Sequence, residues 1–456
     1  MNRFSNRYKA IYSVCRARCD KLIRLLLVLI FILTTAQGIA QAEDLFEDKD
    51  IIDIVGLNYG RLQLTIEIED QSSTAPRQVK QMLAMLTKNL LWSGMFDIRE
   101  SMEESDLRLK IRYQPEKEIR AWIFSQEGMQ LFDEFVNLGN DVPFESALLE
   151  IVESIIYQLT GEKSIFRSAI AYVRKDTTSI NQKGGTRRYE LVMTDTFGSQ
   201  TKLLLHDGEL NILPRWNPDG RSILFTSLGS RGSRLKNLDI KSGKVQTLFS
   251  EMGKLSGGTW GKNGKELIIT LVKRGNADLF RINLRGQILE KMTTRTSSES
   301  NPRWSPDSSR LLFVSNRSGN VQIYQRDLLY KETFRMTFEG TYNVEPSWSN
   351  DGANIVYSGL KDKNFHLFLM DKDGQYVQQL TYGKQSSEQP IWSPNGRQIL
   401  FVAKVGFDQK LFLIRADGTF KRRLTKSGPG ISEFNPTWLP DFNWPKDHIV
   451  TTTLKK

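Results

Sequence analysis

Cysteine is almost absent from this sequence. The two that occur, Cys15 and Cys19, both lie within the first 42 residues. That segment has the features of a secretory signal that is cut off, so we expect the exported chain to hold no cysteine. Disulfides and thiolate metal sites are then excluded, although the compartment itself would permit disulfides.

Long hydrophobic runs are also lacking. The apolar run Leu25–Leu33 covers nine residues, whereas a membrane-spanning helix needs about 20. Seven basic residues precede or adjoin this run, and the small-residue stretch Ala40-Gln41-Ala42 follows it. This order is typical of a signal peptide. We therefore predict a cleaved signal over residues 1–42, with an uncleaved anchor as the alternative.

Residue patterns that carry catalysis or hold metals are missing as well. The three histidines, His206, His366 and His448, are scattered, and neither H-x-H nor H-x-x-x-H occurs. No G-x-S-x-G elbow and no phosphate-binding P-loop occurs either. The stretch "DKDG" (371–374) resembles the start of a calcium loop, but the later ligands are absent, so we interpret it as a turn. We predict no catalytic residue, no metal and no cofactor, and we expect a protein that is not an enzyme.

Net charge gives little support for nucleic-acid binding. The formal charge of +11 falls to +5 without residues 1–42, so we predict no nucleic-acid partner. The remainder is uneven, with −12 over residues 43–160 and +17 over residues 161–456. Solvated surface charge explains this asymmetry most simply. The basic half could also meet anionic lipid headgroups or an acidic protein partner.

The first part of the exported chain predicts a small N-terminal α/β (α+β) domain over residues 43–162. Strands are expected at 61–69, 107–113, 118–124 and 129–136, where apolar and polar residues alternate. Helices are expected at 73–94 and 143–160, where the apolar period changes to that of a helix. The buried stripe of the first helix is predicted to consist of Val79, Met82, Leu83, Leu86 and Leu90.

Tryptophan marks a repeat in the rest of the chain. It stands at positions 216, 260, 304, 348, 392 and 438, with spacings of 44, 44, 44, 44 and 46 residues. Each begins a turn-like tetrad such as "WNPDG" or "WSPNG", and the first five are followed by an apolar strand and two further strands. A period near 44 with four short strands is typical of a β-propeller with a WD40-like repeat. We expect each tryptophan to fill the space between neighbouring blades, and the Asp-Gly and Asn-Gly pairs to make the turns.

The repeat count predicts six blades over residues 163–456. The last tryptophan lacks companion strands, while the strands that begin near Ile170 lack a tryptophan strand. Pairing of the Trp438 strand with the Ile170 strand would complete one blade from both ends of the propeller. The expected fold is therefore multidomain: an α/β domain followed by an all-β six-bladed β-propeller closed by the C-terminal strand. The tail, 441–456, has no assigned role.

Polar segments lead into the tryptophan strands. Ser, Asn, Glu and Gly are frequent in four of these segments, residues 252–259, 297–303, 341–347 and 385–391. In a propeller these segments gather at one mouth of the central channel, on a rigid scaffold suited to partner binding. Their polarity is also what any exposed loop would show.

These features resemble the TolB family, periplasmic propeller proteins of the Tol–Pal envelope system. The resemblance rests on "LTGEKSIFRSAIAYV" (159–173), on the repeat "NPRWSPDSSRLLFVSNRSGNVQIY" (301–324) and on "NLLWSGMFDI" (89–98). It implies a periplasmic scaffold that supports outer-membrane integrity and constriction during cell division. One departure is the short segment between "FDIRES" and "LRLKIRY", where the family has a longer helical connection.

The resemblance also implies partners and a site. The peptidoglycan-associated lipoprotein Pal would dock at the propeller mouth, and inner-membrane Tol proteins would contact the N-terminal region, where residues 43–60 are acidic. Membrane association would be peripheral, through partners. By position relative to the tryptophans, the expected partner-binding residues are Lys254, Gly257, Ser300, Asn301, Glu345 and Gln389.

Two alternatives stay open at this point. One is a propeller hydrolase or lyase with its site in the channel, which would need acid and base groups that converge there. The other is a glycan-binding module of the cell envelope. For sugar platforms it would have to use Trp92, Trp122 or Trp444, the three tryptophans outside the repeat.

Overall fold

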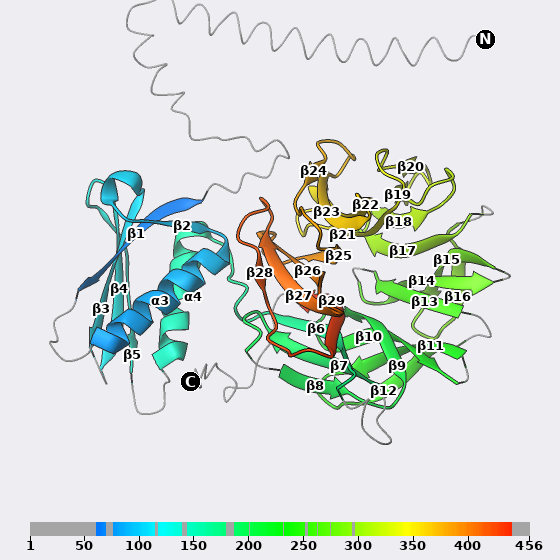
Figure 1. The fold of residues 1–456 in the computed structure, drawn as a ribbon, viewed down its shortest axis with the longest axis horizontal. Helices are drawn as coiled ribbons and strands as arrows, with labels where there is room; N and C mark the ends of the chain where they lie inside the picture. Colours follow the sequence, from blue (N-terminus) through cyan, green and yellow to red (C-terminus); the bar gives the residue numbers. More distant parts are fainter. Residues whose placement is uncertain are drawn as a thin grey trace, which may run out of the picture. The chain divides into compact units, whose positions relative to one another are not determined.

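The computed structural model describes residues 61–69, 76–114, 117–138, 144–178, 187–199, 201–230, 232–250, 254–261, 263–273, 275–293 and 297–439 (Figure 1). The predicted signal peptide, the acidic segment 43–60 and the tail 441–456 lie outside the described residues. No helix among the described residues is both long and apolar enough to cross a lipid bilayer.

The N-terminal α/β region contains a five-stranded sheet in the order β2-β1-β3-β4-β5. Strand β1 runs parallel to both β2 and β3, and β3, β4 and β5 form an antiparallel meander. The strands are β1 (Leu62–Glu69), β2 (Phe96–Arg99), β3 (Leu107–Gln114), β4 (Glu118–Ser125) and β5 (Gln130–Asn137). Two helices accompany them, α3 (Pro76–Ser93) and α4 (Phe144–Thr160). Between β2 and β3 there is one turn of 3₁₀ helix, η1 (Met102–Glu104), in agreement with the short connection seen in the sequence.

Both helices bury their apolar stripes in one core with the sheet. Met82, Leu86 and Leu90 of α3 are fully buried together with Leu64 and Leu109 of the sheet. Burial of each such side chain contributes about 1.5–3 kcal/mol. The prediction for Leu83 is wrong, because 38% of this residue is exposed. Leu83 lies close to Leu90 in angle around the helix but about two turns before it, where α3 borders an open groove described below.

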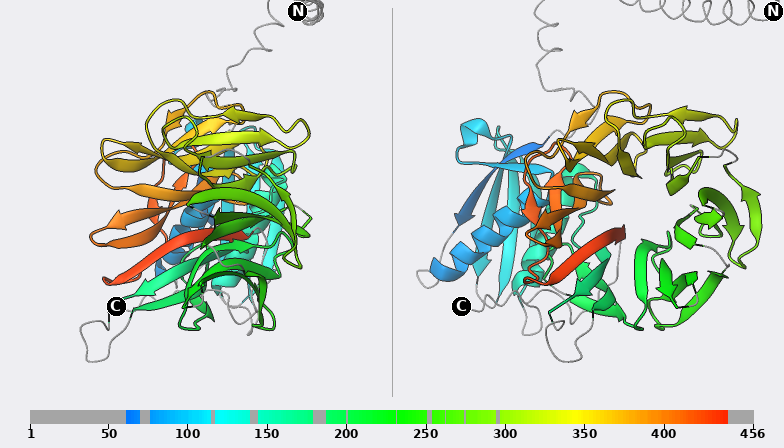
Figure 2. Two further views of the ribbon diagram at one scale, coloured as in Figure 1. Left: turned by 90° about the vertical axis from the view of Figure 1, so that its right-hand side faces the viewer. Right: turned by 45° about the vertical axis from the view of Figure 1, so that its right-hand side comes forward.

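Six four-stranded sheets form a ring of blades, which confirms the predicted propeller (Figure 2). The first complete blade consists of β9 (Leu210–Trp216), β10 (Ser222–Gly229), β11 (Gly232–Asp239) and β12 (Val245–Ser250). The second consists of β13 (Lys254–Trp260), β14 (Glu266–Lys273), β15 (Asn276–Asn283) and β16 (Ile288–Lys291). The third is β17 (Glu299–Trp304), β18 (Arg310–Ser315), β19 (Gln322–Asp327) and β20 (Thr333–Arg335). The fourth is β21 (Asn343–Trp348), β22 (Asn354–Lys361), β23 (Asn364–Asp371) and β24 (Gln378–Gln379), and the fifth is β25 (Ser387–Trp392), β26 (Gln398–Val405), β27 (Asp408–Arg415) and β28 (Arg422–Arg423).

The sixth blade joins two distant parts of the chain, as predicted. It consists of β29 (Ile431–Leu439), β6 (Ala169–Asp176), β7 (Arg188–Asp195) and β8 (Thr201–Leu205), in that order. Trp438 of β29 lies opposite Ile170 of β6 in the antiparallel register. This pairing removes the open edge that an unclosed ring of blades would leave.

The repeated tryptophans end the first strand of each blade and pack against the preceding blade. Trp260 belongs to one apolar cluster with Leu224 and Leu235 of the blade before it. Its indole Nε1 donates to the backbone oxygen of Arg215 at 3.3 Å, and Trp392 donates to Ser347 in the same way at 3.2 Å. The predicted role between blades is confirmed.

The turn that follows each of the first five tryptophans has a residue in the left-handed region. Gly220, Gly264, Gly352 and Gly396 take φ angles between 63° and 71° there. Glycine adopts this conformation without a Cβ clash. The third blade has Ser308 instead, at φ 62°. A serine in this conformation is strained by about 1–2 kcal/mol.

Candidate functional site: the mouth and channel of the propeller

A β-bulge interrupts the first strand of every blade. In five blades the pairing with the second strand shifts at the two residues that lie three and two positions before the tryptophan, and in the second complete blade it shifts one residue earlier, at Ser256 and Gly257. The residue three positions before the tryptophan has a positive φ in all six blades, and in five of them a proline follows it. These six bulge residues are Leu213, Gly257, Asn301, Glu345, Gln389 and Asn435. They form one ring, which we call the bulge ring.

Side chains of the bulge ring bind the backbone of the next blade. The backbone N–H of Gln389 donates to Glu345 Oε2 at 2.7 Å, and that of Asn435 donates to Gln389 Oε1 at 2.6 Å. Leu213 N–H in turn donates to Asn435 Oδ1 at 3.2 Å. Three successive joints between blades are thus closed by a side chain that satisfies an otherwise orphaned bulge N–H.

The joint between Leu213 and Gly257 is closed by packing instead of a side-chain hydrogen bond. Leu213 has no acceptor to offer the next blade, where the bulge residue is Gly257. A Cβ on Gly257 would lie 2.9 Å from Leu213 Cδ1. This joint therefore depends on close packing of the leucine side chain over a bare backbone, and Gly257 is required for both its φ of 81° and its lack of a side chain.

Charged side chains fill the channel next to the ring. Arg215 and Arg303 occupy the position just before the tryptophan in their blades, and each donates to the carbonyl of its preceding proline, at 2.7 and 3.3 Å. Burial lowers the pKa of Arg303 to about 10 and that of Arg215 as well, with the charge of Arg303 adding to the effect on Arg215. Burial raises the pKa of Glu345, against hydrogen bonds from Gln389 and Ser358 and the charges of the two arginines.

This constriction leaves little free space. The cavity lined by bulge-ring residues from five blades, together with Arg215 and Arg303, has a volume of about 20 Å³. That is room for about one water molecule. No group of three or more His, Cys, Asp or Glu side chains within the described part of the chain is placed to hold a metal ion. The arrangement can therefore bind at its surface, but it has no room for a substrate at the ring.

Four of the six predicted site residues belong to the bulge ring, and the other two lie before it in their strands. Gly257, Asn301, Glu345 and Gln389 belong to the bulge ring, and the last three line one cavity. Lys254 begins β13 with its side chain exposed, and half-buried Ser300 donates to Asn301 Oδ1 at 3.1 Å. The interpretation of these segments as loops is wrong, because they form the first strand of each blade. The bulge explains the error: its polar residues and prolines look like a loop, although the strand continues through them.

The sequence analysis missed other residues of the bulge ring and of the channel beside it. Leu213 and Asn435 complete the bulge ring, and Arg215 and Arg303 supply its charge. The signal was present, because each stands at the same offset from its tryptophan as the residues that were predicted.

Exposed aromatic side chains lie at the same end of the ring, on the third to fifth blades. The connections from the fourth strand of one blade to the first of the next, and the hairpins between second and third strands, share this end of the ring. They carry Phe338 (71% exposed), Tyr382 (69%) and the fully exposed Phe407. Tyr342 packs edge-on against Phe365 at 5.8 Å between ring centroids. The mouth thus offers both polar groups and apolar area to a partner.

The α/β region is tied to the opposite end of the propeller, and both belong to one compact unit. Arg415, 5% exposed at its side chain, donates to the backbone oxygens of Leu91 at 2.8 Å and Phe96 at 3.3 Å. The guanidinium of Arg422 lies 3.3 Å from the ring centre of Trp92, which also stacks on Phe197 at 5.1 Å. A cation on one face and an aromatic ring on the other thus cover Trp92.

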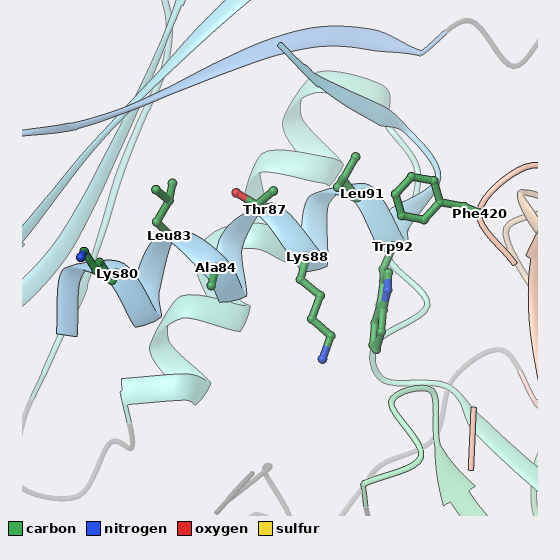
Figure 3. Close-up of a pocket in the computed structure, with 8 residues that line it drawn as sticks. All are labelled: Lys80, Leu83, Ala84, Thr87, Lys88, Leu91, Trp92 and Phe420. Carbon is green, nitrogen blue, oxygen red and sulfur yellow. The ribbon is translucent and has the colours of Figure 1, made fainter. Parts of the chain in front are cut away.

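An apolar groove of about 420 Å³ runs along α3 beside this joint (Figure 3). Leu83, Ala84 and Leu91 form its floor, Lys80 and Lys88 flank it, and Phe420 of the β27–β28 turn closes one end. The exposed position of Leu83 is thereby accounted for, since it belongs to this surface instead of the core.

Comparison with known proteins places this geometry in a family. The family model for the TolB beta propeller domain matches residues 156–441. The Tol-Pal system protein TolB of Legionella pneumophila (strain Corby) is 32% identical over 108 residues, which cover 24% of this chain and 25% of that protein. The protein of the same name from Nitrosococcus oceani is 27% identical over 229 residues, which cover 44% of this chain and 50% of that protein. The matches thus span a quarter to a half of these relatives.

A solved structure shares the fold. The crystal structure of TolB from Acinetobacter baumannii superposes with a TM-score of 0.67 at 22% sequence identity, over 84% of this chain and 97% of that one. At this identity the likeness concerns the fold, including the α/β region that precedes the propeller.

Proposed function

The chain belongs to the TolB β-propeller family, and from this premise we propose that it is a non-enzymatic scaffold of the Tol–Pal system. It would work in the periplasm after export by the predicted signal over residues 1–42. Its partner would be a Pal-like peptidoglycan-associated lipoprotein, and the complex would support outer-membrane integrity and constriction during cell division. Inner-membrane Tol proteins would bind through the N-terminal region.

The observation that carries this proposal is the construction of one mouth. Six equivalent bulges converge there, three of their joints are fixed by side-chain hydrogen bonds, and exposed aromatic residues lie at the same end of the third to fifth blades. A rigid ring of polar groups with an aromatic rim matches the anatomy of protein-binding surfaces. The α/β region contacts turns at the opposite end of the fifth and sixth blades and so leaves this mouth uncovered.

The two alternatives have less support. A hydrolase or lyase in the channel needs space for its substrate, and the cavity at the ring is about 20 Å³. A glycan-binding surface needs free aromatic faces. Trp92 is covered by Phe197 and Arg422, and Arg112 and Arg120 lie over Trp122 at 4.9 and 5.2 Å. Trp444 lies outside the described residues.

The proposal is tested by calorimetric titration of the purified protein with the soluble domain of the same organism's Pal-like lipoprotein. Lys254→Glu reverses an exposed charge at the mouth. Lys265→Glu is the matched control, because Lys265 is also exposed but lies in the turn at the other end of β13. We expect Lys254→Glu to raise Kd about tenfold, because it reverses a charge at the rim of the interface. Lys265→Glu should leave Kd unchanged.

Gln389→Ala tests the ring itself, since it removes the acceptor for Asn435 N–H. We expect weaker binding without loss of fold, checked by circular dichroism. Absence of binding by the folded protein would refute the partner assignment. Binding that responds equally to both lysine substitutions would refute the assigned mouth.

A further inference from the structure

One blade carries an arginine where the repeat places a buried residue without charge. Arg326 of β19 lies opposite Leu311, which in turn lies opposite Trp304. The same register in the other blades gives Leu238, Ile282, Met370, Ile414 and Thr194. All five are at most 2% exposed. The third blade thus introduces a cation into a position that the fold uses for packing between blades.

Arg326 itself is half-buried, and it has no partner among the described residues. Its Nε atom is buried and makes no hydrogen bond to any described residue. No carboxylate in the described part of the chain lies within ion-pair distance of its guanidinium. The ion pairs formed in these two blades belong to other arginines and lysines. A buried charged donor without an acceptor is more unfavourable than a neutral one. A ligand that accepts hydrogen bonds would remove this cost.

A cavity of about 540 Å³ lies beside Arg326, between the second and third blades. Its volume falls within the range of small-molecule sites, about 300–1,000 Å³. Its lining is largely polar and cationic, and consists of Met292, Thr293, Arg317, Tyr324, Arg326, Lys331, Thr333 and Arg335. The strand register explains the grouping. Arg326 lies opposite Thr333 and Tyr324 opposite Arg335, so all four side chains share one face of the β19–β20 pair.

Three of the four cations lack a counter-charge. Arg317 is balanced by the buried carboxylate of Glu299 at 3.2 Å. Arg335 donates to two backbone oxygens, those of Thr337 at 2.6 Å and Phe338 at 3.5 Å. Lys331 and Arg335, like Arg326, form no ion pair with a described residue. Asp278, which accepts from the lining residue Thr293, is already paired with Lys291 at 2.8 Å.

We propose that this cavity binds a small molecule that carries two phosphate groups or one diphosphate. Arginine forks match phosphate oxygens in geometry, and the threonine and tyrosine hydroxyls supply further donors. One phosphate monoester carries ~1.5–2 negative charges, so two phosphates balance the three unpaired cations. The phosphates belong either to a soluble molecule or to a lipid headgroup. This inference does not depend on the proposed role in the Tol–Pal system.

The test compares wild type with Arg326→Leu in calorimetric titration with inorganic pyrophosphate, with inorganic sulfate as the reference anion. Arg326→Leu restores the residue of the first blade, so we expect a folded protein with an unchanged or higher Tm. Arg423→Leu is the matched control, because Arg423 holds the position of Arg335 in the fifth blade, outside the cavity. We expect pyrophosphate to bind wild type more tightly than sulfate, and Arg326→Leu to weaken it roughly 10- to 100-fold.

A second arm measures co-sedimentation with vesicles of cardiolipin, whose headgroup carries two phosphates, and phosphatidylcholine, and with vesicles of phosphatidylcholine alone. Pyrophosphate binding that requires Arg326 supports the site with a soluble ligand. Sedimentation with the anionic vesicles that requires Arg326, without pyrophosphate binding, supports it with a headgroup. The proposal is overturned if neither signal differs between wild type and Arg326→Leu, or if Arg423→Leu reduces both equally.

Discussion

Glu209 holds a cluster of charges at the entrance to the first complete blade, and its removal should destabilise the propeller in a pH-dependent way. Its Oε2 accepts from Lys236 Nζ at 2.7 Å and from Ser227, and its Oε1 pairs with Arg234. The hydrogen bond from Lys236, then that from Ser227, lowers the pKa of Glu209 to about 2, from an ordinary value of 4.5. The perturbation we consider is Glu209→Gln.

The magnitude follows from this pKa. Each unit of difference between folded and unfolded chain is worth about 1.4 kcal/mol, which gives an upper bound of about 3 kcal/mol. The Glu209 side chain is 26% exposed, so solvent screens part of this interaction. We therefore expect Glu209→Gln to lower the free energy of unfolding by about 1–2 kcal/mol at pH 7. Because the folded pKa is depressed, the contribution is complete above pH 4.5 and is lost as pH falls toward 2.

The assay is urea denaturation of wild type and Glu209→Gln at pH 7 and at pH 3, followed by tryptophan fluorescence. The difference between the two proteins should shrink at the lower pH. Glu332→Gln serves as the control, because Glu332 is an exposed carboxylate next to the β19–β20 turn. An equal destabilisation at both pH values would show that Glu209 acts through packing or hydrogen-bond shape. In that case the electrostatic reasoning would be refuted.

Two further stability predictions concern the turn and the joint. Ser308→Gly should raise the free energy of unfolding by about 1 kcal/mol in urea denaturation, because it relieves a non-glycine residue at φ 62°; Ser309→Gly, one position on, should not. Arg415→Met should loosen the joint between α3 and the propeller, because it removes the hydrogen bonds to Leu91 and Phe96. We expect about 2–4 kcal/mol less protection of the C-terminal end of α3 in hydrogen exchange, with the innermost strands of the propeller unaffected.

The repeat made most of the propeller predictable. A tryptophan every 44 residues fixes where each blade begins, and the Asp-Gly and Asn-Gly pairs fix the turns. The surplus strand near Ile170 and the solitary strand at Trp438 together required closure, and the structure pairs those two residues. The helices of the α/β region were found for a similar reason, since their apolar period extends over more than four turns.

What could not be predicted depends on contacts between distant parts of the chain. The β-bulge keeps polar residues such as Asn301 and Glu345 within a strand, because the hydrogen bonds of the flanking residues continue on both sides of it. Leu83 is as apolar as a core residue, but it lines a groove whose end is closed by Phe420, which is over 300 positions away in sequence. No periodicity within α3 contains that information.

The repeat has a second use, because it turns a position in the sequence into a position in space. Once the register is known, a residue that departs from its counterparts in the other blades marks a place where local selection differs from the demands of folding. Leu213 and Gly257 depart from the polar bulge ring together, and they compensate each other by direct packing. Arg326 departs from a buried uncharged position without any compensating residue in the described chain. The first departure is therefore explained by a contact within the protein, whereas the second calls for a bound ligand. This difference is why the cavity beside Arg326 is the better place to look for a ligand.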